Sequence, residues 1–370
     1  MILLNQPVIG EEEITNVCSA LRETYISGIV GKFKQEFEER FSAYCGVRYG
    51  ISTTSGTTAL HLALAVLGIG PGDEVIIPTL TNIATAFAVV YCGATPVVVD
   101  SESETFNMDV SQIESKITPK TKAIMPVHLY GHPVDMDPLL EIAHRYGLYV
   151  VEDAAEAHGA QYRGRRVGCL GDIGCFSFLA NKIITTGEGG MVVTDNPEFA
   201  KKANSLKNLA FSSERKFLHH EIGFNYRLTN IQAAIGVAQL DRIDKVLIRK
   251  REIAEFYNQR FQNIEGLVLP VEKEWAYHVY WVYGFLVEED KFGRSRDDVV
   301  SVFKERGIEP RTSFIPMHQQ PVFHKMGILK DANCPVAEEV SRKGLYLSAG
   351  WGMMDEELEY IANTLLQLRR

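Results

Sequence analysis

The sequence has few cysteines, no long apolar run and no excess of basic residues. Its six cysteines show no CxxC spacing and mostly lie among apolar or small residues. We therefore expect buried thiols in a reducing compartment, and neither disulfides nor a metal site. No segment reaches a membrane-spanning length, and the N-terminus has no basic leader, so a cytoplasmic location is expected.

The charge balance limits the classes of partner. The net charge is −9 at pH 7, whereas nucleic acids and anionic membranes are bound mainly by basic surfaces. We expect no nucleic acid and no membrane as partner, although a few local arginines could still hold a small anionic ligand. Hydrophobic residues make up 46% of the 370 residues, which is typical of a globular protein with a large and a smaller domain.

Strand-like and helix-like patterns alternate in the first two thirds of the chain. Short apolar runs at 74–77, 95–99, 122–127 and 148–151 alternate with helical patterns at 81–92, 110–117 and 138–146. This alternation predicts an α/β fold with parallel strands and right-handed crossovers. From about Asp241 the pattern indicates a smaller α+β unit, with a long helix to Phe261, a strand at 280–287 and further helices. We predict a large domain at 1–240, including an N-terminal arm, and a small domain at 241–370.

Lys182 lies between two strand-like runs in the stretch CFSFLANKIITTGEGGMVVTD, which starts at Cys175. A lysine is most often a solvated surface residue. The neighbouring Asn181 and Thr185 instead suit a polar pocket, as does the glycine turn that follows. A desolvated lysine has a lowered pKa and can act as a Schiff-base nucleophile.

Two other segments allow both a chemical and an ordinary interpretation. Ser55, Gly56 and Thr57 precede an almost wholly apolar helix, so they could hold a phosphate at its N-terminus or could simply cap it. Asp153 follows the apolar run at 148–151, at the sheet edge where ligands bind in such folds. Its offset from Glu156 is also that of a capping box at the start of a helix.

The segment that follows the lysine stretch is less regular. Residues 207–218, KNLAFSSERKFL, are charged and irregular, so we predict a surface loop. Thr229 and Gln232 have the spacing of a capping box and predict the start of a long helix. Arg227, just before it, could bind an anion or face solvent.

Several motifs occur in a recognisable order: SGTTALHLAL, DEVIIPTLT, GATPVVVD, KAIMPVHLYGHPVDMD, VEDAAEAHGA, NKIITTGEGGMVVTD and GFNYRLTNIQAA. Together they resemble the DegT/DnrJ/EryC1/StrS family of sugar aminotransferases, from about Ile9 to the C-terminus. The resemblance implies a fold type I aminotransferase that uses pyridoxal 5'-phosphate (PLP). It also implies a homodimer with active sites shared between subunits.

The resemblance assigns roles to residues of this sequence. Lys182 would form the Schiff base with the cofactor and move protons, and Asp153 would pair with the pyridine nitrogen. The resemblance places further residues at the cofactor: Ser55, Gly56, Thr57 and Ser177 at its phosphate, Asn225 from the partner subunit, and Glu156 beside it. The candidates for the substrate side are Glu188, Arg227, Arg311 and His318.

The implied reaction moves an amino group from glutamate to C4 of a nucleotide-linked 4-keto-6-deoxy sugar. The first choice is GDP-4-keto-6-deoxymannose, in deoxyamino-sugar biosynthesis for lipopolysaccharide O-antigen. The alternatives are dTDP- or UDP-linked keto sugars and a non-catalytic regulatory protein with this fold. Lysine at position 182 favours amino transfer over dehydration, because the related dehydratases have histidine there.

The sequence departs from the family pattern at three places. Asn82 stands where many relatives have an aromatic residue that stacks on the cofactor ring. Leu179-Ala180 replaces the Phe-Gly of similar family members, and the 208–213 loop lacks their glycines. The last two changes lie toward the predicted substrate side.

Overall fold

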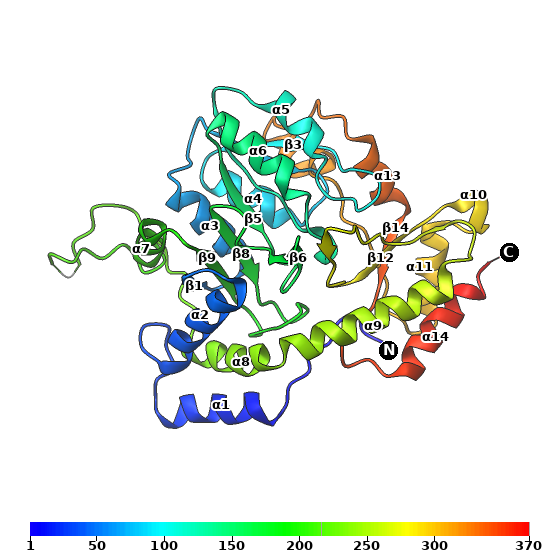
Figure 1. The fold of residues 1–370 in the computed structure, drawn as a ribbon, viewed down its shortest axis with the longest axis horizontal. Helices are drawn as coiled ribbons and strands as arrows, with labels where there is room; N and C mark the ends of the chain where they lie inside the picture. The colour runs from blue at the N-terminus through cyan, green and yellow to red at the C-terminus, as the bar shows by residue number, and fades with distance from the viewer. Residues whose placement is uncertain (216, 370) are drawn as a thin grey trace.

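The structure, a computed structural model, describes residues 1–215 and 217–369. At its centre is a seven-stranded sheet with the order β1-β9-β8-β5-β4-β2-β3 (Figure 1). The strands are β1 (Tyr49–Thr53), β2 (Glu74–Pro78), β3 (Thr95–Val99), β4 (Thr121–Ile124), β5 (Tyr149–Asp153), β8 (Ile173–Ser177) and β9 (Gly190–Thr194). Strands β3, β2, β4, β5 and β8 run parallel to one another, and β9 is antiparallel to both β8 and β1. The predicted α/β fold with a mostly parallel sheet is confirmed.

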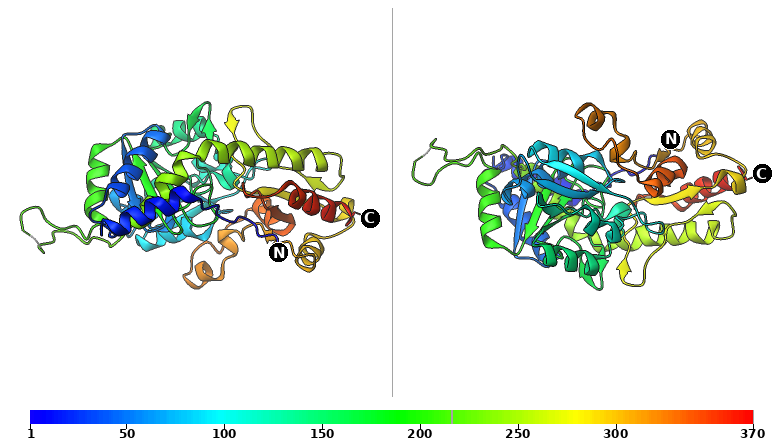
Figure 2. Two further views of the ribbon diagram at one scale, coloured as in Figure 1. Left: turned by 90° about the horizontal axis from the view of Figure 1, so that it is seen from below. Right: turned by 90° about the horizontal axis from the view of Figure 1, so that it is seen from above.

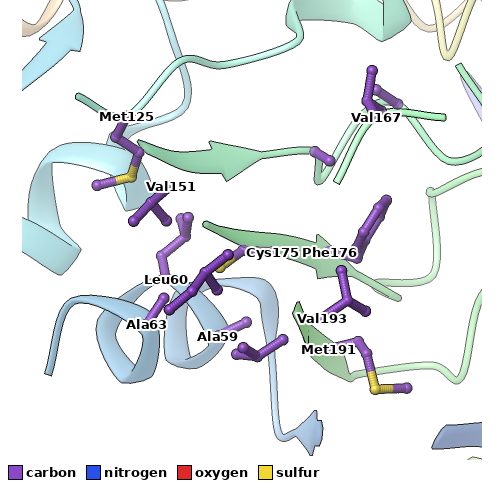
Figure 3. Packing of buried hydrophobic residues seen from close by; sticks show 14 of the residues in the cluster. Ala59, Leu60, Ala63, Met125, Val151, Val167, Cys175, Phe176, Met191 and Val193 are labelled. Carbon is purple, nitrogen blue, oxygen red and sulfur yellow. The ribbon is translucent and has the colours of Figure 1, made fainter. Parts of the chain in front are cut away.

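The helices around the sheet follow the apolar patterns of the sequence. They are α1 (Glu11–Arg22), α2 (Lys32–Cys45), α3 (Gly56–Val66), α4 (Ile83–Tyr91), α5 (Ile113–Lys116), α6 (Met136–Tyr146) and α7 (Pro197–Leu206). Helix α3 is buried along most of its length. Figure 3 shows Ala59 and Ala63 of α3 beside strands that carry Val151 and Cys175. Small side chains allow the helix to pack closely on the sheet, which fixes where its N-terminus lies.

Two sequence expectations in this region need correction. No helix begins at Asp153, because residues after β5 form turns and the Glu156 carboxylate accepts a hydrogen bond from the Tyr130 amide instead of capping a helix (2.9 Å). The long helix after Thr229 is interrupted at Arg242, which gives α8 (Asn230–Asp241) and α9 (Ile243–Phe261). The Thr229 capping box is present.

The C-terminal part contains a four-stranded antiparallel sheet with the order β10-β12-β14-β13. Its elements are β10 (Leu267–Val268), β12 (Tyr283–Val287), α10 (Glu289–Phe292), α11 (Arg296–Glu305), β13 (Arg311–Thr312), α12 (Pro321–Lys325), α13 (Pro335–Lys343), β14 (Gly344–Leu347) and α14 (Asp355–Leu366). Strand β14 was not predicted, because its four residues directly continue the pattern of α13. The C-terminal sheet and helices have a hydrophobic cluster of their own.

Helix α9 joins the two parts of the chain. Its first turns pack into the cluster of the large sheet and its later turns into the C-terminal cluster. A second connection is a small sheet of β6 (Gln161–Tyr162), β7 (Arg165–Arg166) and β11 (Ala276–Tyr277). The domain boundary at residue 241 stays a prediction.

The segment between α7 and α8 extends away from the body in all the views of Figures 1 and 2. The predicted surface loop is confirmed for most of its length, but its first residue, Lys207, is only 3% exposed. Among the residues the structure describes, no helix is long and apolar enough to cross a membrane.

Candidate active site

A cavity of about 340 Å³ lies at the carboxyl ends of β5 and β8. This is the edge at which α/β sheets bind ligands. The structure brings most of the predicted site residues to its wall, namely Ser55, Gly56, Thr57, Asp153, Glu156, Ser177, Lys182, Glu188 and Arg311. They come from four separate segments of the chain: three belong to the large sheet and its connections, and Arg311 belongs to the C-terminal sheet.

Lys182 is buried, so its interpretation as a solvated residue is wrong. Its side chain is 9% exposed, and its Nζ lies 3.9 Å from Glu156 Oε1 and 3.8 Å from the centre of the Trp281 ring. Burial lowers the pKa of Lys182, while the charges of Glu156 and Asp153 act in the opposite direction. A buried amine with a lowered pKa is what Schiff-base chemistry requires.

Two carboxyl groups share this end of the sheet. Asp153 accepts hydrogen bonds from Thr85 Oγ1 (2.8 Å) and the Ala155 amide (3.2 Å). Burial raises the pKa of Asp153, and these hydrogen bonds oppose that rise. Burial also raises the pKa of Glu156 to about 7, against the charge of Lys182 and the Tyr130 amide. The site therefore places a carboxyl group with a pKa of about 7 beside a lysine whose pKa is lowered, which is a combination typical of functional sites.

The N-terminus of α3 forms another wall of the cavity. Ser55 Oγ accepts a hydrogen bond from the Thr58 amide (3.2 Å), so the predicted cap is present. A side chain at Gly56 would place its Cβ only 2.7 Å from Ser177 Cβ, so glycine is required for the close approach of α3 to β8. The first amides of a helix lack intrahelical partners, so this wall is suited to an anion.

Three predicted residues lie outside the cavity wall. Asn225 is exposed, and Arg227 donates a hydrogen bond to Asn208 Oδ1 (2.8 Å). His318 is 6% exposed and its ring nitrogens contact Thr79 Oγ1 (2.7 Å) and Glu338 Oε1 (2.9 Å). These contacts tie α13 to the segment after β2, so the structure gives His318 a packing role and does not bring it to the substrate side. Arg311 lines the cavity but also pairs with Glu309 (3.0 Å).

The cavity also contains residues that sequence reasoning missed, among them Trp281, Phe314 and Tyr346. They lie in or beside C-terminal strands, where aromatic residues look like ordinary core, and no local motif distinguishes them. Asn82 lines the cavity as well and caps α4 by accepting a hydrogen bond from the Ala84 amide (3.0 Å).

Comparison with known proteins identifies the family. The model of the DegT/DnrJ/EryC1/StrS aminotransferase family matches residues 7–366. GDP-perosamine synthase of Caulobacter vibrioides is 45% identical over 98% of this chain and 96% of its own length. The dTDP-3-amino-3,4,6-trideoxy-alpha-D-glucose transaminase of Streptomyces venezuelae is 40% identical over 87% of this chain and 83% of its own. Spr1654, a candidate sugar aminotransferase from Streptococcus pneumoniae solved in its PLP form, superposes with a TM-score of 0.92 and 30% identity, over 99% of this chain and 97% of its own.

The residues of the cavity fit PLP. A buried lysine amine suits an aldehyde, a buried carboxylate suits a protonated ring nitrogen, and a helix N-terminus flanked by hydroxyls suits a phosphate. The space beside Gly56 could not hold a side chain, since a Cβ there would lie 2.7 Å from Ser177 Cβ and 3.2 Å from Ser177 Oγ. This chain belongs to the DegT/DnrJ/EryC1/StrS aminotransferase family and is a PLP-dependent sugar-nucleotide aminotransferase.

Proposed function

We propose that this enzyme transfers the amino group of glutamate to C4 of GDP-4-keto-6-deoxymannose and so forms GDP-perosamine. The observation that carries the proposal is the 45% identity to GDP-perosamine synthase over 98% of the chain. The cavity supports it, since it places a lysine, two carboxyl groups and a helix N-terminus around a space of about 340 Å³. We retain the cytoplasm as the predicted location.

The residues of the cavity divide the chemical tasks. When bound, PLP would act as an electron sink that stabilises negative charge on the carbon from which the proton is removed. Lys182 would bind the cofactor through Nζ and would move the proton to and from the substrate carbon, while Asp153 would keep the ring nitrogen protonated. Ser55, Gly56, Thr57 and Ser177 would hold the phosphate, and Glu156 would hold a proton beside Lys182. On the substrate side, Glu188 and Arg311 line the cavity and are assigned to the sugar or to the glutamate carboxylate.

A dTDP- or UDP-linked keto sugar is the second candidate substrate. It is favoured by the 40% identity to a transaminase whose name specifies a dTDP sugar. Leu179 is 38% exposed and lies in the cavity wall two residues before Asn181. This position, which departs from the Phe-Gly pattern, is where a different sugar would be accommodated.

Turnover with glutamate and a panel of keto sugars tests the proposal. We expect amino transfer to GDP-4-keto-6-deoxymannose to exceed transfer to dTDP- and UDP-linked 4-keto-6-deoxyglucose in kcat/KM by at least tenfold, a difference of about 1.4 kcal/mol in transition-state binding. A preference for a dTDP or UDP sugar would select the second candidate. Activity on none of them, with PLP bound, would reject both substrates.

We also propose that the enzyme is a homodimer with shared active sites. Segment 25–31 packs against the start of α8, where Asn230 Nδ2 donates to Tyr25 O (2.6 Å), and its Ile29 is 65% exposed. Leu21 in α1 and Ile222 in the projecting segment are also exposed, at 50% and 86%. Exposed apolar residues of this kind are typical of an interface between subunits. Asn225, at the base of the projecting segment, is assigned to the partner's cofactor phosphate.

Hybrid dimers test the shared site. Lys182→Ala and Asn225→Leu are each expected to be inactive, yet their mixture after unfolding and refolding together regains roughly a quarter of the wild-type activity, because half of the dimers then contain one intact site. A second pair, Lys182→Ala mixed with Asp153→Asn, places both lesions in residues of one subunit's cavity and serves as a matched control. Equal recovery in both mixtures, or a monomer by light scattering, would refute the role of Asn225.

A further inference from the structure

Each polar atom of Trp281 makes a hydrogen bond, although the residue belongs to no regular strand. Its amide donates to Tyr130 O (2.9 Å), and its indole Nε1 donates to Asn181 O (2.7 Å). Its carbonyl accepts hydrogen bonds from Lys250 Nζ (3.1 Å) and Asn5 Nδ2 (3.2 Å). Trp281 is 4% exposed, so its ring is fixed in the wall of the cavity.

The indole face is turned to the amino group of Lys182. Lys182 Nζ lies 3.8 Å from the ring centre, and among the described residues it has no hydrogen bond, its nearest charged partner being Glu156 at 3.9 Å. An ammonium over a tryptophan ring is attracted by the negative face of the ring, and the attraction is strongest where water is excluded. The ring therefore replaces part of the hydration that burial removes.

We propose that the amino group of Lys182 rests on the indole face of Trp281 whenever it is not bound to the cofactor, and that Asn5 and Lys250 hold this face in position. The inference rests on the proposed role of Lys182, since a Schiff-base lysine must be free while the amino group travels on the cofactor. Trp281 thus keeps the free lysine within the cavity and partly offsets the effect of burial on its ammonium form.

The two holding residues come from distant parts of the chain. Asn5 Nδ2 donates both to Trp281 O and to Asn181 O (3.1 Å), so the N-terminal arm joins Trp281 to the residue next to Lys182. Lys250 is 2% exposed and also donates to Ala349 O (2.7 Å). Burial lowers the pKa of Lys250 to about 7, and carbonyl oxygens are its hydrogen-bond partners. A buried lysine without a close carboxylate is costly, which is consistent with a positioning role.

The pH profile of Lys182 acetylation in the cofactor-free protein tests whether the free amino group lies on the Trp281 ring. Acetic anhydride reacts with the neutral amine, so the midpoint of labelling against pH, measured by peptide mass spectrometry, reports the ionisation of Lys182. We expect Trp281→Leu to move the midpoint down by about one pH unit, because the ring no longer stabilises the ammonium. Trp281→Phe, which keeps a weaker ring, is expected to move it less.

The sign of the change separates the proposal from a simple packing role. If Trp281 only excluded water, its loss would hydrate Lys182 and move the midpoint up. The other titratable groups that act on Lys182 are Glu156 and Asp153, and these variants leave both in place. The nearby His158 is neutral, since burial and then Lys182 lower its pKa to about 3. An upward shift, or none, in Trp281→Leu would overturn the proposal.

Trp275→Leu is the matched control, because Trp275 lines a different cavity, and we expect its loss to leave the midpoint unchanged. Asn5→Ala and Lys250→Met are expected to give downward shifts smaller than that of Trp281→Leu; no shift in either would refute the holding role. The measurement needs neither cofactor nor substrate. If no nucleotide sugar is aminated, the proposed function is rejected. The labelling midpoints still decide the role of Trp281, because they do not depend on turnover.

Discussion

Lys182 and Lys207 are both buried lysines, but their surroundings differ. Lys207 Nζ donates hydrogen bonds to Glu38 Oε1 (2.7 Å) and Ser52 O (3.1 Å). Lys182 Nζ has Glu156 only at 3.9 Å and a ring face at 3.8 Å. Burial lowers the pKa of both amines, so a lowered pKa does not distinguish them. What distinguishes them is that the amine of Lys207 is engaged in hydrogen bonds, whereas the amine of Lys182 makes none to the described residues and stays available in the cavity.

The difference extends to what each lysine does in the fold. Lys207 joins the start of the projecting segment to α2 and to β1, through Glu38 and Ser52. Strand β1 leads directly to Ser55 and the start of α3, so Lys207 supports the site from outside. Lys182, by contrast, lines the cavity itself. Variants at the two positions should therefore separate loss of chemistry from loss of stability.

The largest effect is expected for Lys182→Ala. The variant should lose the visible absorption band of bound PLP that borohydride fixes in the wild type. Its aminotransferase activity should fall by roughly 10⁴-fold or more, since both covalent binding and proton transfer depend on this amine. Absorption spectra and turnover with glutamate measure the two losses. A borohydride-fixed band that persists in Lys182→Ala would place the Schiff base elsewhere.

Lys207→Met should instead reduce stability. Removal of one member of a buried ion pair costs about 3–5 kcal/mol when the other charge is left without a partner, and Lys34, which lies 3.6 Å from Glu38, places the expected loss toward the lower end of this range. Urea unfolding should show this decrease, while the folded fraction keeps the PLP band and its reaction with borohydride. If folded Lys207→Met protein fails to bind PLP, the distinction between an engaged and an available lysine is wrong.

Sequence motifs predicted the lysine that lines the cavity but not the one engaged in hydrogen bonds. Lys182, Asp153 and the Ser55–Thr57 turn lie beside strand ends that apolar patterns locate, so the sheet brings them together as predicted. Lys207 opens an irregular, charged segment that looks like a surface loop. Its burial depends on Glu38, which lies 169 residues away in the sequence, and no local pattern reports so distant a partner.

The same limit explains the rest of the site. Trp281 is fixed by Asn5, 276 residues away, so its place in the cavity could not be predicted from its apolar surroundings. His318 was a candidate for the substrate side, yet its side chain is occupied by Thr79 and Glu338. Motifs therefore predicted which segments meet at the cavity, and side-chain partners decided which of their residues face it.

Glu156 and Glu38 are the carboxyl partners of these two lysines. Their contributions to the free energy of unfolding should change with pH in opposite directions. The pKa of Glu156 is raised by burial from 4.5 to about 7. Between these values the folded protein binds more protons than the unfolded chain, so its free energy of unfolding falls as pH rises. Glu156→Gln lacks this decrease, and its stability relative to the wild type should increase by up to roughly 3 kcal/mol between about pH 5 and about pH 8.

Glu38→Gln provides the control for this comparison. Burial disfavours the Glu38 carboxylate, but the charges of Lys207 and Lys34 outweigh it and lower its pKa. The stability that Glu38 contributes is therefore present above its unfolded pKa and is lost as pH falls. Glu38→Gln should be less stable than the wild type at neutral pH, with a difference that shrinks in acid. Urea unfolding of cofactor-free protein at several pH values checks both slopes, and slopes of the same sign would contradict the contrast.

The smallest effect is expected at the helix cap, where Ser55 and Ser295 can be compared. Each caps a helix by accepting a hydrogen bond from the amide three residues later, so Ser55→Ala and Ser295→Ala should each lower the free energy of unfolding of the cofactor-free protein by about 1 kcal/mol. Only Ser55 lines the cavity, and only Ser55→Ala should weaken PLP binding, by roughly tenfold if one phosphate hydrogen bond is lost. If the two variants lose equal stability and bind PLP with the same affinity, Ser55 acts only as a helix cap. A cap stabilises its helix wherever the helix lies, whereas a phosphate contact can form only at the cavity.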